Sequence, residues 1–247
     1  MKPTLNLEKI PEVVQDDVRA FMNDLLAIHG EEIVSIVIYG SAAGGQYVPR
    51  RSDVNSAVIF GDIDFSVLKK SLSVISSAGR KKIRAPLFLT QEYILSSLDV
   101  FPIEFLDMQQ QHVLIYGEDV LSSLDVPRQY VRLFCEQEIK GKLIRIRQAY
   151  LEVGLKPKAV DALLKDSLNS LIPIFRNLLR LRNKSVTFDK TAVLEHACGE
   201  FQLNSKIFTA IYRHVAGGEK IPGAEMDLRF GEYLAELKKL SRGIEKI

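Results

Sequence analysis

The sequence lacks the residue patterns of several protein classes. Its 247 residues include no tryptophan and only two cysteines, Cys135 and Cys198, which is too few for a disulfide framework or a four-cysteine zinc site. No apolar run approaches the roughly 18 residues that a membrane-spanning helix needs. The N-terminal residues lack the apolar core of a secretory signal. We therefore expect a cytoplasmic protein with no membrane partner.

The composition is that of an ordinary globular protein. Hydrophobic residues make up 47% of the chain and charged residues 26%, and there is no internal repeat or low-complexity stretch. At about 150 residues per domain, this length corresponds to one large domain or two smaller ones.

The small net charge of +2 conceals an uneven distribution along the chain. Residues 1–127 carry a net charge of −6, residues 128–184 carry +8, and residues 185–247 are neutral. Such asymmetry suggests that the basic segment binds an anionic ligand, either a nucleotide or a nucleic acid.

The first half of the chain alternates between strand and helix patterns. The run Ile-Val-Ser-Ile-Val-Ile-Tyr at 33–39 is typical of a strand covered on both faces. Pro86 weakens the strand pattern at 83–89. Within the helix expected at 62–77, the residues Phe65, Leu68, Leu72 and Ile75 form one stripe. The pattern predicts strands at 33–39, 54–60, 83–89 and 102–108, and helices at 11–28, 62–77 and 91–98.

The second half contains helix patterns only. Strands alternating with helices, followed by helices alone, indicate two domains, 1–127 and 128–247. The second is expected to be an all-helical bundle. Its helices are predicted at 129–153, 158–182, 190–201, 205–216 and 225–247.

Residues 38–60 carry the most informative motif. The strand at 33–39 ends in Gly40-Ser41, and a polar loop then leads to Asp53 at the start of the next strand. A glycine lets a phosphate approach the backbone, and the Ser41 hydroxyl can donate a hydrogen bond to it. Asp53 and Asn55 are two residues apart on a strand, so their side chains point to the same face. Two oxygen ligands at this spacing can hold a hard divalent cation.

This motif resembles the nucleotidyltransferase fold of the DNA polymerase beta superfamily, and more closely its small bacterial, antibiotic-adenylyltransferase-like branch. Gly40 and Ser41 match the glycine-serine pair of that family, and Asp53 matches its first carboxylate. The segment Phe-Pro-Ile-Glu-Phe at 101–105 matches the context of a third carboxylate, so Glu104 is the candidate for that position. The resemblance covers about residues 31–120. It implies an α+β architecture, in which a mixed-sheet nucleotidyltransferase-like domain precedes the helical domain.

The resemblance also implies an activity. It predicts transfer of a nucleoside monophosphate from an NTP to an acceptor hydroxyl, with Mg²⁺ or Mn²⁺ as the metal. Gly40 and Ser41 would bind the triphosphate, Asp53 and Asn55 would bind metal, and Glu104 would be the third ligand or the base. Asn55 replaces the family's second carboxylate and brings no charge, which should weaken at least one metal site. The acceptor, whether a small molecule, a protein or RNA, is not identified by the sequence.

Two alternatives to this activity remain open at this point. The first is a catalytically weakened member that binds a nucleotide or a protein partner in a regulatory or antitoxin-like role, including as a homo-oligomer. The second is an RNA-binding module that uses the basic helices.

Individual residues also have plainer interpretations. Asp53 could open a strand through an Asx turn, Asn55 could be an ordinary hydrogen-bonded strand residue, and Glu104 could be a half-exposed strand residue. Two groups of basic residues could be either solvated loops or contacts to an anion. The first group is Arg50 and Arg51. The second is Arg80, Lys81, Lys82 and Arg84.

Overall fold

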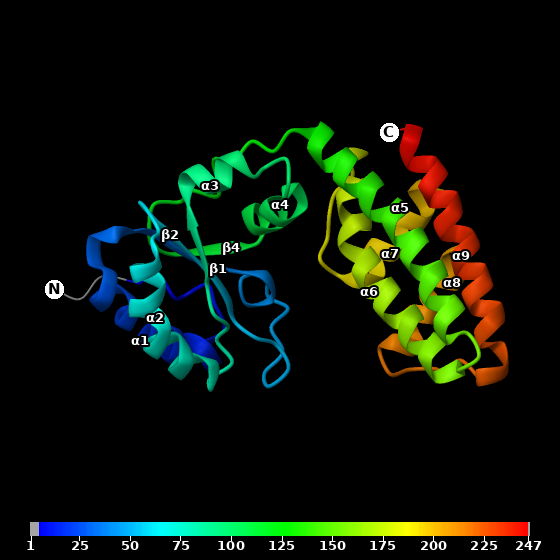
Figure 1. Ribbon diagram of the computed structural model, residues 1–247, viewed down its shortest axis with the longest axis horizontal. Helices are drawn as coiled ribbons and strands as arrows, with labels where there is room; N and C mark the ends of the chain where they lie inside the picture. Colours follow the sequence, from blue (N-terminus) through cyan, green and yellow to red (C-terminus); the bar gives the residue numbers. More distant parts are fainter. Residues whose placement is uncertain (1–4, 247) are drawn as a thin grey trace. The chain divides into compact units, whose positions relative to one another are not determined.

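The computed structural model describes residues 5–246 and divides after Val126 into two compact units (Figure 1). Each unit has its own hydrophobic core and is described by itself. Within the described residues, no helix is both long and apolar enough to cross a membrane.

The N-terminal unit is built on a four-stranded mixed sheet with the strand order β3-β2-β1-β4. Strand β1 pairs antiparallel with both β2 and β4, whereas β2 and β3 run parallel. This arrangement confirms the expected mixed sheet. The strands are β1 (Ile33–Tyr39), β2 (Asn55–Phe60), β3 (Leu87–Thr90) and β4 (His112–Gly117).

Helices cover both faces of this sheet. Helices α1 and α2 pack on one face and α3 and α4 on the other (Figure 1). Alternate residues of β2 enter the two cores, since Val58 and Phe60 join the α1–α2 side and Ala57 and Ile59 join the α3–α4 side. By this alternation Asn55 belongs to the α3–α4 face. The helices are α1 (Glu12–His29), α2 (Phe65–Gly79), α3 (Gln91–Ser96) and α4 (Pro102–Gln110), and short 3₁₀ turns occupy Gly30–Glu32 and Gly40–Ala42.

The strand expected at 102–108 is wrong, because this segment forms helix α4. Proline at the first position of a helix is favoured, because its fixed φ suits the helix and its missing N–H would have no partner there. Phe105 and Met108, three residues apart, then face the core together. A short apolar run does not by itself distinguish a strand from a buried helix. The fourth strand is instead β4, which the sequence pattern did not reveal.

The third strand is shorter than expected. It begins at Leu87, directly after Pro86, which has no N–H to donate to a neighbouring strand. Upstream of the proline, an isolated parallel bridge joins Val54 to Ile83. The chain before β3 therefore still runs beside the residues that precede β2.

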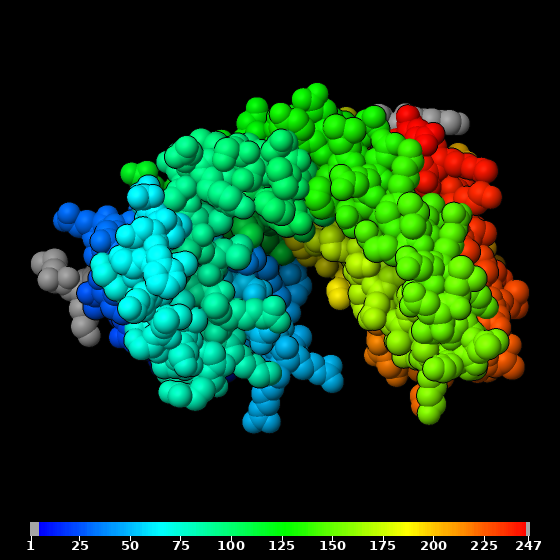
Figure 2. All heavy atoms as spheres, viewed as in Figure 1, coloured from blue at the N-terminus to red at the C-terminus, as the bar shows by residue number. Residues whose placement is uncertain are grey.

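Three of the four residues of the apolar stripe of helix α2, Phe65, Leu68 and Leu72, face solvent, and Ile75 packs against the core. Phe65 is 77% exposed and Leu72 is 64% exposed, whereas Val67, Ser71 and Ala78 are buried. The spheres of α2, cyan in Figure 2, accordingly lie at the surface. The most apolar residues of α2 therefore lie mainly on one side of the helix, and a different side packs on the sheet.

The C-terminal unit is all-helical, as the sequence predicted. Helix α6 is its most buried element, and Leu168, Leu171, Phe175 and Leu178 are fully enclosed. It packs against α5, α7, α8 and α9. The helices are α5 (Arg128–Val153), α6 (Pro157–Leu181), α7 (Lys190–Glu200), α8 (Ser205–Val215) and α9 (Met226–Gly243), with 3₁₀ turns at Gly223–Glu225 and Ile244–Lys246.

The exposure of α2 gives a test of its placement. Leu72→Ala should change the free energy of unfolding by less than about 0.5 kcal/mol, because an exposed side chain has little to lose. Leu25→Ala, at a fully buried leucine of α1, should cost about 2–5 kcal/mol. Urea unfolding of both variants measures the difference. Equal losses would mean that the α2 stripe packs inside the protein.

Candidate functional site

The Gly40–Ser41 turn lies at the end of β1. Gly40 has a φ of +72°, which strains any residue with a side chain, and it begins the 3₁₀ turn Gly40–Ala42. Its N–H donates to the carbonyl of Gln111 at 3.2 Å, which ties the turn to the junction of α4 and β4. The Ala43 and Gly44 N–H groups donate back to the Gly40 carbonyl at 3.0 and 2.9 Å. The turn is therefore fixed by its own backbone.

Asn55 lies against this turn. It is paired with Tyr39 across the β1–β2 ladder. A Cβ atom added to Gly40 would lie 3.5 Å from Asn55 Nδ2. The structure thus brings together two of the residues that the motif singled out, Gly40 and Asn55.

Asp53 forms an ion pair that the sequence did not reveal. Its Oδ2 accepts a hydrogen bond from Arg84 Nε at 2.7 Å, with the Asp53 side chain 30% exposed and that of Arg84 68% exposed. Backbone pairing aligns the two residues, because the Val54 N–H donates to the Lys82 carbonyl and the Arg84 N–H to the Val54 carbonyl, both at 3.0 Å. The first expected carboxylate therefore already has a cationic partner.

Tyr39 lies within the influence of the same guanidinium. Burial raises the pKa of Tyr39, and the positive charge of Arg84 acts in the opposite direction. Tyr39 also packs against the core between the sheet and α4. The end of β1, the start of β2 and the segment before β3 therefore form one polar region.

Glu104 is placed differently from the expectation. It lies in the first turn of helix α4 and is exposed, rather than on a strand beside Asp53. In residues 5–246, no group of three or more His, Cys, Asp or Glu side chains could hold a metal ion. The oxygen donors at the start of β2 are one carboxylate bound to Arg84 and one neutral amide. This donor set does not fit a preformed divalent-cation centre, and the metal-ligand roles of Asp53, Asn55 and Glu104 stay predictions.

Many of the basic residues of the helical unit are used inside that unit. Lys140 pairs with Glu136 at 2.6 Å and with Glu245 at 2.9 Å. Lys142 is buried and donates to Ser170. Further pairs join Arg132 to Glu136, Arg145 to Glu138, Lys165 to Asp161, and Arg182 and Lys184 to Glu200. Several cations of the 128–184 segment are thus held in local ion pairs, although its net charge of +8 already counts three of the paired carboxylates, Glu136, Glu138 and Asp161.

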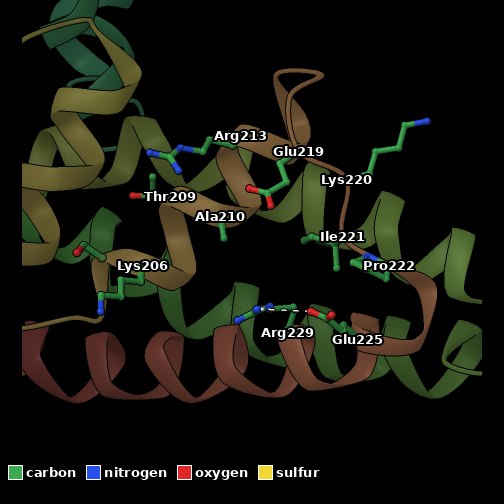
Figure 3. Close-up of a pocket in the computed structure, with 11 residues that line it drawn as sticks. Lys206, Thr209, Ala210, Arg213, Glu219, Lys220, Ile221, Pro222, Glu225 and Arg229 are labelled. Carbon is green, nitrogen blue, oxygen red and sulfur yellow. Dashed lines mark ion pairs between the residues drawn. The ribbon is translucent and has the colours of Figure 1, made fainter.

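The helical unit contains a cavity of about 420 Å³ between α8, the loop after it and the start of α9 (Figure 3). Ala210 and Ile221 supply apolar lining, and Arg229 is held by Glu225 at 3.5 Å. Lys220 points away from the cavity, whereas the Glu219 carboxylate points into it. Side chains of both charge signs line this cavity. The residues that line it do not include any from the motif at 38–60.

A histidine network holds the loop that lines this cavity. The Ile221 N–H donates to His214 Nδ1 at 3.2 Å, so the proton of the neutral ring lies on Nε2, which donates to Asp161 at 2.5 Å. Lys165 donates to the second oxygen of Asp161 at 2.8 Å. Burial opposes ionisation of Asp161, but these hydrogen bonds outweigh it and hold the pKa of Asp161 below its usual value.

This lowered pKa predicts a pH-dependent stability. A carboxyl whose pKa is lower in the folded chain stabilises the fold above its unfolded pKa, and the contribution is lost as the pH falls through the folded value. Asp161→Asn should therefore lower the free energy of unfolding by about 1–3 kcal/mol at pH 7, and its difference from the unchanged chain should shrink below about pH 4. Urea unfolding across this range tests it, with Asp166→Asn on the same helix as the control. A difference that stayed constant with pH would contradict the assignment.

Comparison with known proteins supports the fold. No protein-family model and no curated protein matches the sequence. Among solved structures, the spectinomycin adenyltransferase AAD(9) from Enterococcus faecialis, crystallised with ATP and spectinomycin, is similar over 90% of this chain and 97% of that chain. The sequence identity is 15% and the TM-score 0.56, so the likeness shows the fold and not the reaction. The chain shares the fold of that protein, and its own structure consists of a mixed-sheet domain followed by a helical domain.

Proposed function

We propose that the chain binds a nucleoside triphosphate at the end of β1 and transfers its nucleoside monophosphate to an acceptor hydroxyl. The observation that carries this proposal is the packing of the Gly40–Ser41 turn against Asn55, two residues after Asp53 on β2. The motif that suggested the reaction is thus gathered at one end of the sheet. The solved neighbour was crystallised with ATP, which makes ATP the first nucleotide to test.

The proposed roles follow from the chemistry of each group. Gly40 leaves room for a phosphate beside the backbone, and the Ser41 hydroxyl donates a hydrogen bond to it. The acceptor oxygen attacks the α-phosphorus, the bond from that phosphorus to the bridging oxygen breaks, and pyrophosphate leaves. Glu104, exposed on α4, is the candidate base that takes the acceptor's proton. Because the donor set does not fit a preformed metal centre, no step is assigned to a metal.

A specific observation favours a second function, nucleotide binding without turnover. Asp53 is bound to Arg84, and the next oxygen donor on the strand is the amide of Asn55. Phosphoryl transfer depends on positive charge placed on the triphosphate and on alignment of the attacking and leaving oxygens. A site whose one carboxylate is already bound to an arginine contributes less to aligning the attacking and leaving oxygens. Such a protein would act through its nucleotide-bound state or through a partner.

The internal ion pairs of the helical unit weaken the RNA-binding alternative. An RNA site needs a basic surface that can exchange its counterions for phosphates. Arg132, Lys140 and Arg145 instead have carboxylate partners within their own unit. We therefore do not assign nucleic-acid binding to these helices.

ATP binding tests the proposed site. Gly40→Ala should weaken ATP binding at least ~10-fold, because a side chain at positive φ costs about 1–2 kcal/mol and would distort the turn. Gly30→Ala is the matched control, since Gly30 also has a positive φ, a Cβ there meets no atom within 4 Å, and it precedes the opposite end of β1. Isothermal titration calorimetry measures both variants. Equal loss of affinity in the two would place the nucleotide elsewhere.

Turnover separates the two candidate functions. Labelled NTPs are incubated with the full chain, Mg²⁺ or Mn²⁺ and a pool of small-molecule, protein and RNA acceptors, and adducts and pyrophosphate are measured. Transfer that Asp53→Ala reduces by ~100-fold or more would support the enzyme. Binding without any adduct would support the second function.

Restoring the missing charge gives a further test of the Asn55 interpretation. Asn55→Asp should raise transfer in Mg²⁺ by ~10-fold, because a second carboxylate adds the charge that the family's site carries. Ser56→Asp is unsuitable as a control because Ser56 is buried, so Ser52→Asp in the preceding loop serves instead. A gain in both variants would mean that added negative charge acts nonspecifically.

A further inference from the structure

Two basic loops meet beside the candidate site. The loop between β1 and β2 carries Arg50 and Arg51, and the segment between α2 and β3 carries Lys82 and Arg84. Lys82 Nζ donates to the Arg50 carbonyl, which joins the two loops. Backbone hydrogen bonds of Val54 to Lys82 and of Arg84 to Val54, each of 3.0 Å, extend the contact. Residues that are 31 positions apart in sequence, Asp53 and Arg84, therefore become neighbours.

The backbone of both loops is strained at this contact. Arg50 has a φ of +67° and Lys82 a φ of +58°. Both lie in the left-handed region, which residues other than glycine and asparagine rarely adopt. Strained residues of this kind persist only where their surroundings hold them, and they concentrate at ligand sites. Here the strain occurs at two basic residues whose chains touch.

The charges of this region do not balance. Arg50, Arg51, Lys82 and Arg84 are exposed, and Asp53 is the carboxylate that pairs with one of them. The neighbouring Lys81 is different, because it pairs with Asp17 of α1 at 2.7 Å. Four exposed cations on two touching loops, with one of them paired to a carboxylate, are a candidate site for a multiply charged anion.

Arg84 is suited to bind that anion while it remains paired. The bond to Asp53 uses Nε, one of the five N–H donors of a guanidinium. A guanidinium held by a carboxylate presents its remaining donors in a fixed plane, and arginine binds phosphate oxygens in this way. Because the positive charge of Arg84 acts on Tyr39, the residue before Gly40, the guanidinium lies near the Gly40–Ser41 turn.

We propose that Arg84, with Arg50, Arg51 and Lys82, supplies the positive charge for the triphosphate at this site, so that the chain binds a nucleoside triphosphate without a divalent cation. This inference rests on the proposed nucleotide site at Gly40 and Ser41. The motif assigns the Asp53 carboxylate to a metal, but in the structure this carboxylate is bound by the guanidinium of Arg84. The proposal follows from this disagreement.

Calorimetric titration of the full-length chain with ATP tests the proposal. The titration is run in EDTA and in Mg²⁺ at matched ionic strength. We expect the two dissociation constants to agree within about threefold. Arg84→Ala should weaken binding in EDTA at least ~10-fold, and Arg84→Lys, which keeps the charge but not the planar fork, should lie between it and the unchanged chain. Lys81→Ala, which removes a paired charge three residues away, should change the affinity less than twofold.

The possible outcomes separate the two proposals. ATP binding that requires Mg²⁺ would overturn the metal-free mode and leave the nucleotide site standing. Binding in EDTA that Arg84→Ala leaves unchanged would also overturn it. Absence of ATP binding in both buffers would instead contradict the proposed function itself. Thermal melting of each variant establishes that the fold is retained before binding is compared.

Discussion

The antiparallel pairing of β1 with β2 is the constraint on which the candidate site depends. It sets Tyr39 opposite Asn55 and thereby places the amide against the Gly40 turn. The buried residues of both strands fix this register, because a slip by one residue would move Val58 and Phe60 from the α1–α2 core to the α3–α4 core and disrupt the packing of both. The core that stabilises the sheet therefore also positions the polar residues at its end. A short loop alone would not hold them as precisely.

Part of the fold could be predicted from local patterns. The β-branched run of β1 has the predicted bounds, because a strand buried on both faces leaves a continuous apolar signature. The segment beginning at Pro102 could not be assigned in this way, since its short apolar run suits a strand or a helix equally. Its conformation is decided by the helix-favouring proline and by the packing of Phe105 and Met108 against the sheet. The exposed stripe of α2 shows the same limit, because periodicity indicates which residues share a face but not which face meets the sheet.

The candidate site was predictable to a similar extent. Strand spacing predicts that Asp53 and Asn55 share a face, although Asp53 lies just before β2, and the turn after β1 identifies Gly40. No local signal predicts that Arg84 meets Asp53, because the contact depends on the parallel bridge of Val54 with Ile83. The net charges of the regions do not locate the basic loops of the site. Residues 128–184 have a net charge of +8, but several of their cations pair with carboxylates of the same unit. The unbalanced basic loops lie within residues 1–127, whose net charge is −6. Averages over a hundred residues conceal a cluster that chain topology creates.

The Asp53–Arg84 pair changes the role that the motif gives to Asp53. A divalent cation on that carboxylate would lie near the guanidinium, and two such charges about 4 Å apart repel by several kcal/mol even at an effective dielectric constant of about 20. The cation and Arg84 therefore compete for Asp53. If Arg84 keeps its place, Asp53 acts as a positioning residue that aligns a phosphate-binding guanidinium. A second carboxylate at position 55 would favour the cation in this competition, whereas the neutral amide of Asn55 leaves the guanidinium in place.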